Sequence, residues 1–180
     1  MLPQTLTTST WPLANPDFRA QISAPDATSS AGIYLLSTAP FNLHDAQLGD
    51  FLARSEVPVF LRTQVTAPGE ILDSALLNPH CWVVDIARCG PDLHILSELG
   101  VSPAQLAVEL ELQKIGPEWV LENASEEFLG GGDLWEILEH LDGLGLGAVL
   151  IRASQSATEF DEDFLFSLVE AVDVPIKIVK

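Results

Sequence analysis

AVLIRASQSATEFDEDFLFSLVEAVDVPIKIV, residues 148–179, places one amphipathic run between two short apolar runs. The apolar runs at 148–153 and 175–180 have the length and the β-branched content of strands. The run at 161–172 repeats apolar residues at three- and four-residue spacing, which predicts a helix. Because parallel strands need a crossover that a helix supplies, this order predicts a βαβ unit in an α/β fold.

The same alternation runs through most of the chain. Further strands are predicted at 32–37, 57–62 and 81–87, and further helices at 44–55, 68–77, 91–100 and 133–145. Asp133 opens the last of these helices with Glu136 three positions later, which is the spacing of a capping box. We expect a mostly parallel sheet of alternating βα units in an incomplete (β/α) barrel of the TIM type. An open doubly wound sheet is the alternative.

Residues 102–114, SPAQLAVELELQK, fit two structures. Ser102, Pro103 and Gln105 have the spacing of a helix start. Farther along, apolar and polar residues alternate strictly, so a helix would spread the leucines around its whole circumference whereas a strand gathers them on one face. We favour a strand and keep the helix as the alternative. A second short strand is expected at 118–123, after a Gly-Pro turn.

The sequence pattern changes at Ala31. Residues 1–30 are rich in Thr, Ser, Pro and Ala without a sustained period, which predicts an irregular N-terminal arm with a short strand around 18–22. Residues 31–180 are predicted to form a single α/β domain. The chain lacks a run of roughly 20 apolar residues and a secretory signal pattern, so we expect a cytoplasmic protein.

Acidic residues dominate the composition. The chain has 26 Asp and Glu against 8 Lys and Arg, giving a formal net charge of −18. Such a charge repels nucleic acid and anionic membranes, so neither is expected as a partner. The four histidines show no metal-ligand spacing, and no zinc or serine-hydrolase motif occurs, so neither a metal nor a cofactor is predicted.

The few basic residues are concentrated in the predicted strands. Those in a strand or at its end are Arg62, Arg88, Arg152, Lys177 and Lys180. In parallel α/β folds, ligands bind at the carboxyl ends of the strands, where all of these except Lys177 would gather. Guanidinium groups placed there suit a phosphate or a carboxylate, which they bind through paired hydrogen bonds.

Acidic residues on neighbouring strands offer a different explanation for these arginines. Asp85, Glu109 and Glu111 could neutralise them in internal ion pairs, because an isolated buried charge is costly. The anion site and the internal pairing do not exclude each other. On a strand, Glu109 and Glu111 would also share one face, where they could serve as general base and general acid.

Lys177 lies between Ile176 and Ile178. A lysine desolvated in this way can have a lowered pKa and form a Schiff base with a carbonyl substrate. The structural alternative is a stem packed on apolar surface with its ammonium group reaching water.

Two parts of the chain repeat one pattern. The order strand, polar loop, helix and Val-Pro strand occurs at 31–62 and again at 147–179. The chain from about Ala31 to Lys180 thus resembles the histidine-biosynthesis barrels, namely the cyclase subunit of imidazole glycerol phosphate synthase and its sister isomerase. These are built from two similar half-barrels. The resemblance would make QLAVELELQ the fifth strand, AVLIRAS the sixth and VPIKIV the seventh.

The resemblance implies an eighth βα unit that this chain lacks. The N-terminal arm or a second subunit could complete the barrel, so a homodimer is among the expected assemblies. We expect binding of a small anionic metabolite, phosphorylated or carboxylated, at the strand carboxyl ends. Isomerase- or lyase-type proton transfer is the expected chemistry if the protein is an enzyme. The alternative is a non-catalytic degenerate barrel acting as an acidic protein–protein interaction module.

Overall fold

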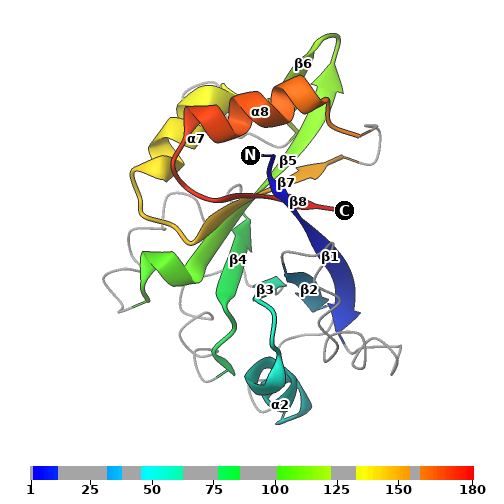
Figure 1. Cartoon of the computed structure of the whole chain (residues 1–180), viewed down its shortest axis with the longest axis vertical. Coiled ribbons are helices and arrows are strands. Elements are labelled where there is room, and N and C mark those ends of the chain that lie inside the picture. The colour runs from blue at the N-terminus through cyan, green and yellow to red at the C-terminus, as the bar shows by residue number, and fades with distance from the viewer. Residues whose placement is uncertain are drawn as a thin grey trace.

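The computed structural model (Figure 1) describes residues 2–11, 32–37, 46–62, 77–85, 101–122, 133–154 and 159–180. Three sequence predictions fall largely or wholly outside these ranges: the strand around 18–22 and the helices at 68–77 and 91–100. Arg88 lies outside them as well.

Seven parallel strands close into a barrel. They are β1 (Gln4–Trp11), β2 (Ile33–Ser37), β3 (Val59–Arg62), β4 (Cys81–Asp85), β5 (Leu106–Ile115), β7 (Ala148–Ala153) and β8 (Ile176–Val179). β1 pairs with both β2 and β8, and β4 pairs with both β3 and β5, so the ring has no open edge. The α/β class and the parallel barrel are confirmed, and the open doubly wound sheet is wrong.

The first strand of the barrel corrects the expected N-terminal arm. Gln4–Trp11 is regular β1 rather than irregular chain, and it fills the gap between β2 and β8. Its threonines are β-branched and favour extended backbone, while Leu6 and Trp11 are buried. The strand forms because hydrogen-bonding partners on both sides come from segments far away in the sequence.

The ambiguous segment at 102–114 is a strand over most of its length. β5 pairs with β4 on one side and β7 on the other, and the helix-start signal yields only a 3₁₀ turn at Pro103–Gln105. β6 (Glu118–Leu121) returns antiparallel to β5 after a turn in which Gly116 has φ of 62°. This left-handed conformation favours glycine. The predicted second strand and Gly-Pro turn are therefore confirmed.

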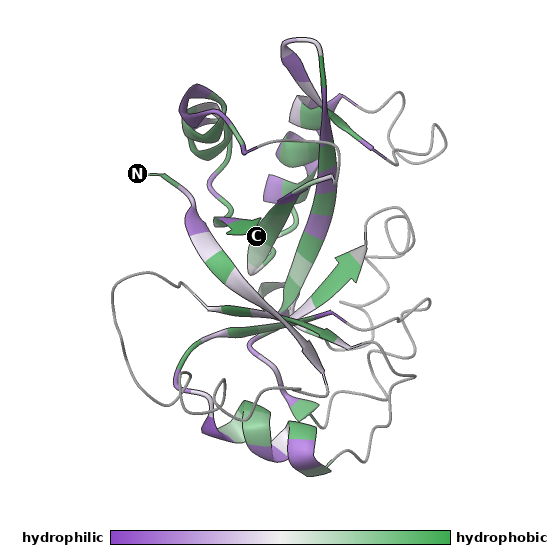
Figure 2. Ribbon diagram, turned by 90° about the vertical axis from the view of Figure 1, so that its right-hand side faces the viewer, coloured by the Kyte–Doolittle hydropathy of each residue, from purple (hydrophilic) through white to green (hydrophobic). Residues whose placement is uncertain are grey.

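Three helices are described outside the barrel: α2 (Ala46–Arg54), α7 (Leu134–Asp142) and α8 (Glu162–Ala171). They confirm the predictions at 44–55, 133–145 and 161–172. The Asp133 side chain caps α7 by accepting a hydrogen bond of 2.8 Å from the amide of Trp135. α7 and α8 lie together, and α2 lies at the opposite end of the molecule (Figures 1 and 2). None of these helices has the length and apolar character needed to cross a membrane.

Alternating residues along the strands separate an outer apolar layer from an inner one. The outer layer includes Val108 and Ile151 and packs against helix residues such as Ile137 of α7 and Leu168 of α8. The inner layer consists of Leu6, Tyr34, Phe60, Cys81, Val83, Ala107, Ala148, Leu150 and Val179. Hydrophilic and hydrophobic residues succeed one another along these strands in Figure 2. The barrel interior is thus a packed core, and its polar side chains gather toward the ends.

Candidate functional site

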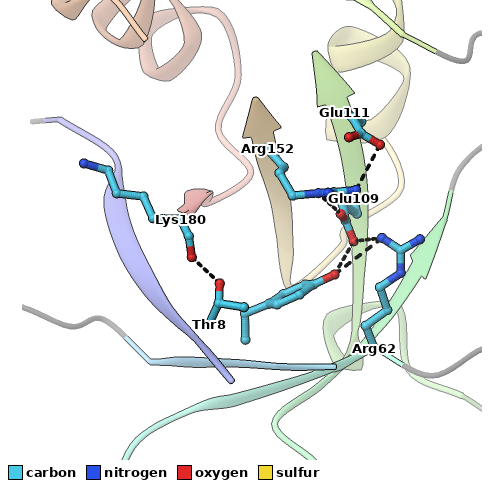
Figure 3. A network of polar contacts seen from close by, with 7 residues as sticks. Thr8, Arg62, Glu109, Glu111, Arg152 and Lys180 are labelled. Carbon is cyan, nitrogen blue, oxygen red and sulfur yellow. Dashed lines mark hydrogen bonds and ion pairs between the residues drawn. The ribbon is translucent and has the colours of Figure 1, made fainter. Parts of the chain in front are cut away.

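One buried carboxylate, Glu109, is the centre of a polar network inside the barrel (Figure 3). The Tyr34 hydroxyl on β2 donates a hydrogen bond of 2.6 Å to Glu109 Oε2. Arg62 Nη1 on β3 contacts the same oxygen. Arg152 Nε on β7 donates to Glu109 Oε1 at 2.8 Å. Glu109 therefore links its own strand, β5, to three other strands of the barrel from within.

The barrel geometry explains why these side chains meet. β2 and β5 are not neighbours in the sheet, so the bond from Tyr34 to Glu109 crosses the barrel interior. β5 and β7 are neighbours, and Glu111 and Arg152 are register partners whose side chains share the inner face. Arg62 is the last residue of β3, and Arg152 is the last but one of β7. The network therefore lies toward the carboxyl ends of the strands.

Exposure rises from the centre of the network to its rim. The Glu109 side chain is 2% exposed, Arg62 is 22% exposed and Arg152 is 35% exposed. Arg152 Nη2 also donates a hydrogen bond of 2.9 Å to Glu111 Oε2, and the Glu111 side chain is 26% exposed. Arg152 therefore lies between a buried carboxylate and one that water reaches.

The formal charges of the network cancel. Arg62 and Arg152 share Glu109 and together exceed its charge by one, and Glu111 offsets that excess. The gathering of these two arginines and their pairing with internal carboxylates were both expected from the sequence, and the structure contains both. The assignment of Arg62 and Arg152 to anion binding and of the two glutamates to catalysis stays a prediction.

The remaining predicted cations lie elsewhere. Lys180 is exposed, its ammonium group is 3.3 Å from Glu159 Oε1, and its side chain points away from the arginines (Figure 3). Its main-chain carbonyl accepts a hydrogen bond from Thr8. The expected gathering of Lys180 with the arginines is therefore wrong. Lys180 follows β8 rather than lying within it, so the strand does not direct its side chain into the barrel, and the side chain reaches water. The side chain of Asp85 lies outside the described part of the structure.

Lys177 lies away from the arginine network. Its ammonium group contacts Oε1 of Gln4, the first residue of β1 and its register partner. Apolar side chains of the inner layer, including Leu150 and Val179, follow toward the carboxyl ends. Burial lowers the pKa of Lys177. Its predicted role as a Schiff-base lysine would thus place a reaction near the amino ends of the strands.

Tyr34 is a member of the network that the sequence analysis missed. It is the chain's one tyrosine and lies in an apolar strand, where a buried hydroxyl needs a hydrogen-bond partner. This need for a partner is the sequence signal that could have identified Tyr34 as a member of a polar network. Burial raises the pKa of Tyr34, and the negative charge of Glu109 raises it further, so the hydroxyl stays protonated and can donate.

A metal site is not evident in the part of the chain that the structure describes, where no three His, Cys, Asp or Glu side chains could hold an ion together. A scan against protein-family models finds no match for the chain, and a search of curated proteins finds none either. The resemblance to the histidine-biosynthesis barrels accordingly stays a prediction from the sequence pattern. What the protein can bind has to follow from its own residues.

Proposed function

We propose that the protein binds a small anion, carboxylated or phosphorylated, at the carboxyl-end mouth of the barrel. Arg152 is the principal ligand and Arg62 the second. The observation that carries this proposal is the convergence of two guanidinium groups, from β3 and β7, on one buried carboxylate. They converge at the end of the strands where parallel barrels bind their ligands. A closed barrel of seven parallel strands accommodates such a site.

Glu109 serves in this proposal as an anchor for the two arginines. Its two oxygens accept hydrogen bonds from different strands, and the Tyr34 hydroxyl restrains the carboxylate further. Guanidinium groups held in this way lose little conformational entropy when a ligand binds. A carboxylate already engaged by three donors is better suited to fixing positions than to exchanging protons.

An exposed guanidinium group, rather than a net positive charge, lets the site meet an anion in spite of the acidic surface. The chain as a whole carries −18 and repels anions at long range. Exposed charges are screened over roughly 8 Å at physiological ionic strength, so an anion near the mouth interacts mainly with the closest groups. Arg152 is the most exposed of the four charged groups and is the first that such an anion would meet.

Two finer expectations remain predictions within this proposal. Proton transfer of the isomerase or lyase type would use Glu111, because Glu109 is occupied as the anchor. Schiff-base chemistry at Lys177 would require a second site near the amino ends of the strands. The alternative function, an acidic protein–protein interaction module, also stays a prediction, as does a homodimer.

Thermal unfolding in phosphate and in succinate, a dicarboxylate, tests the proposed site. A ligand at 100 times its Kd stabilises the folded state by about 2.7 kcal/mol, which corresponds to roughly 5–10 °C in Tm for a domain of this size. One or both of these anions should therefore raise the Tm of the wild type by several degrees above potassium chloride of equal ionic strength. The chloride arm is needed because salt alone relieves repulsion in an acidic protein.

Variants of single arginines identify the residue responsible. Arg152→Ala should abolish the rise produced by phosphate or succinate, and Arg152→Lys should retain part of it because it keeps the charge but loses the fork geometry. Arg54→Ala is the matched control, since Arg54 is an exposed arginine on α2 paired with Asp50. Equal responses of the wild type to phosphate, succinate and chloride, or an undiminished rise in Arg152→Ala, would overturn the proposal.

A further inference from the structure

We infer that Glu111 is an internal substitute for a ligand carboxylate, and that the anion bound at Arg152 is itself a carboxylate that displaces Glu111. The inference rests on the proposed function and adds to it the chemical class of the ligand and the residue that sets its affinity. Two glutamates bind the same guanidinium group in this structure, but they are held in different ways.

The two glutamates differ in what restrains them. Glu109 is almost fully buried and is bound from three strands by Tyr34, Arg62 and Arg152. Glu111 is one-quarter exposed and contacts the network through Arg152 Nη2. Removing Glu109 from Arg152 would deprive a buried charge of one of its partners, whereas Glu111 can turn into water at the rim. Glu111 is therefore the exchangeable carboxylate.

The geometry of Arg152 allows the exchange. Glu109 binds Nε and Glu111 binds Nη2, so the two carboxylates approach the guanidinium plane at different positions. A free carboxylate that replaces Glu111 can bond Nη1 and Nη2 in parallel, which is the stronger two-bond arrangement. Glu111 is covalently part of β5, so its position is restricted, and it accepts one hydrogen bond, from Nη2. A mobile ligand can thus improve on the contact that it displaces.

Charge favours a carboxylate over a phosphate in this exchange. A monocarboxylate group brings one negative charge to Arg152, the same charge that Glu111 removes when it turns away. A phosphate dianion would add a further negative charge close to Glu109 and to the displaced Glu111, and like charges at such distances repel. The network is therefore matched to a carboxylate in charge as well as in shape.

Titration calorimetry tests the inference with inorganic phosphate and with succinate, a dicarboxylate whose second carboxylate can stay in water while the first binds Arg152. Glu111→Gln removes the competing charge, so its succinate Kd should fall about tenfold below that of the wild type, equivalent to about 1.4 kcal/mol. Glu111→Asp keeps the charge but is one methylene shorter, which weakens its hold on Arg152, and its Kd should lie between the two. The full chain is used, with circular dichroism to verify the fold of each variant.

Glu118→Gln is the matched control because Glu118 is an exposed glutamate on β6, and its substitution removes the same charge from the chain. Its succinate Kd should equal that of the wild type. An unchanged Kd in Glu111→Gln, or an equal gain in Glu118→Gln, would overturn the inference while leaving the anion site intact. Tighter phosphate binding without tighter succinate binding would overturn the assignment of a carboxylate. Absence of binding of both anions to the wild type and to Glu111→Gln would refute the proposed function itself.

Discussion

Glu109→Gln perturbs the centre of the network with little change of shape. The substitution keeps one oxygen that can accept a hydrogen bond but removes the charge shared by Arg62 and Arg152. It also replaces the other oxygen with an amide NH₂, which cannot accept from the donors that now face it. We therefore expect the two arginines to repel each other and the folded state to lose stability.

The expected loss follows from the burial of the partners. Breaking a buried ion pair by removing one member costs about 3–5 kcal/mol. Arg62 and Arg152 are 22% and 35% exposed, so water partly solvates them once the charge of Glu109 is gone. The remaining amide oxygen also keeps part of one interaction. We expect the free energy of unfolding to fall by about 2–3 kcal/mol.

Urea unfolding followed by far-ultraviolet circular dichroism measures this loss. The wild type and Glu109→Gln are compared at pH 7 with Glu118→Gln, which removes an exposed charge and should change the free energy of unfolding by less than about 0.5 kcal/mol. A loss in Glu109→Gln of the same size as the control would refute the role of Glu109 as an anchor for the barrel.

Two further substitutions test the polar side chains that line the barrel. Tyr34→Phe removes a donor from Glu109 and should cost about 1–2 kcal/mol of unfolding free energy at pH 7. Because burial, and then Glu109, raises the pKa of Tyr34 in the folded chain, wild-type stability should fall above about pH 10, where the unfolded chain ionises first. Denaturation curves from pH 8 to 11 should show a shallower fall for the phenylalanine variant, and equal slopes would contradict the burial of this hydroxyl. Lys177→Met removes an ammonium group whose pKa burial lowers, so charging Lys177 disfavours the folded state at neutral pH and the variant should have the higher Tm at pH 7. The difference should shrink as pH rises toward the unfolded pKa of lysine, and a lower Tm for the variant at pH 7 would show that the ammonium group stabilises the fold.

Local sequence patterns predicted most of the strands and the composition of the network. The alternation in β5 favoured a strand over a helix because the leucines fall on one face only at a period of two. The same period places Glu109 and Glu111 on the opposite, inner face. Since carboxyl ends of parallel strands lie at one end of a barrel, the meeting of Arg62 and Arg152 could also be expected.

Closure of the barrel could not be predicted in the same way. It depends on pairing between β1 and β8, which lie at opposite ends of the sequence, and a local period carries no information about such a partner. The Thr- and Ser-rich β1 has few apolar residues to mark a buried face. Tyr34 was missed because β2 is buried on both faces, so the pattern does not tell which of its residues point inward.

A crystal structure of the protein grown in succinate tests the central claim most directly. The account predicts a carboxylate on Nη1 and Nη2 of Arg152, with Glu111 turned toward solvent and Glu109 still bound by Arg62 and Arg152. Guanidinium groups of Arg62 and Arg152 that point separately into bulk solvent, without sharing Glu109, would contradict it.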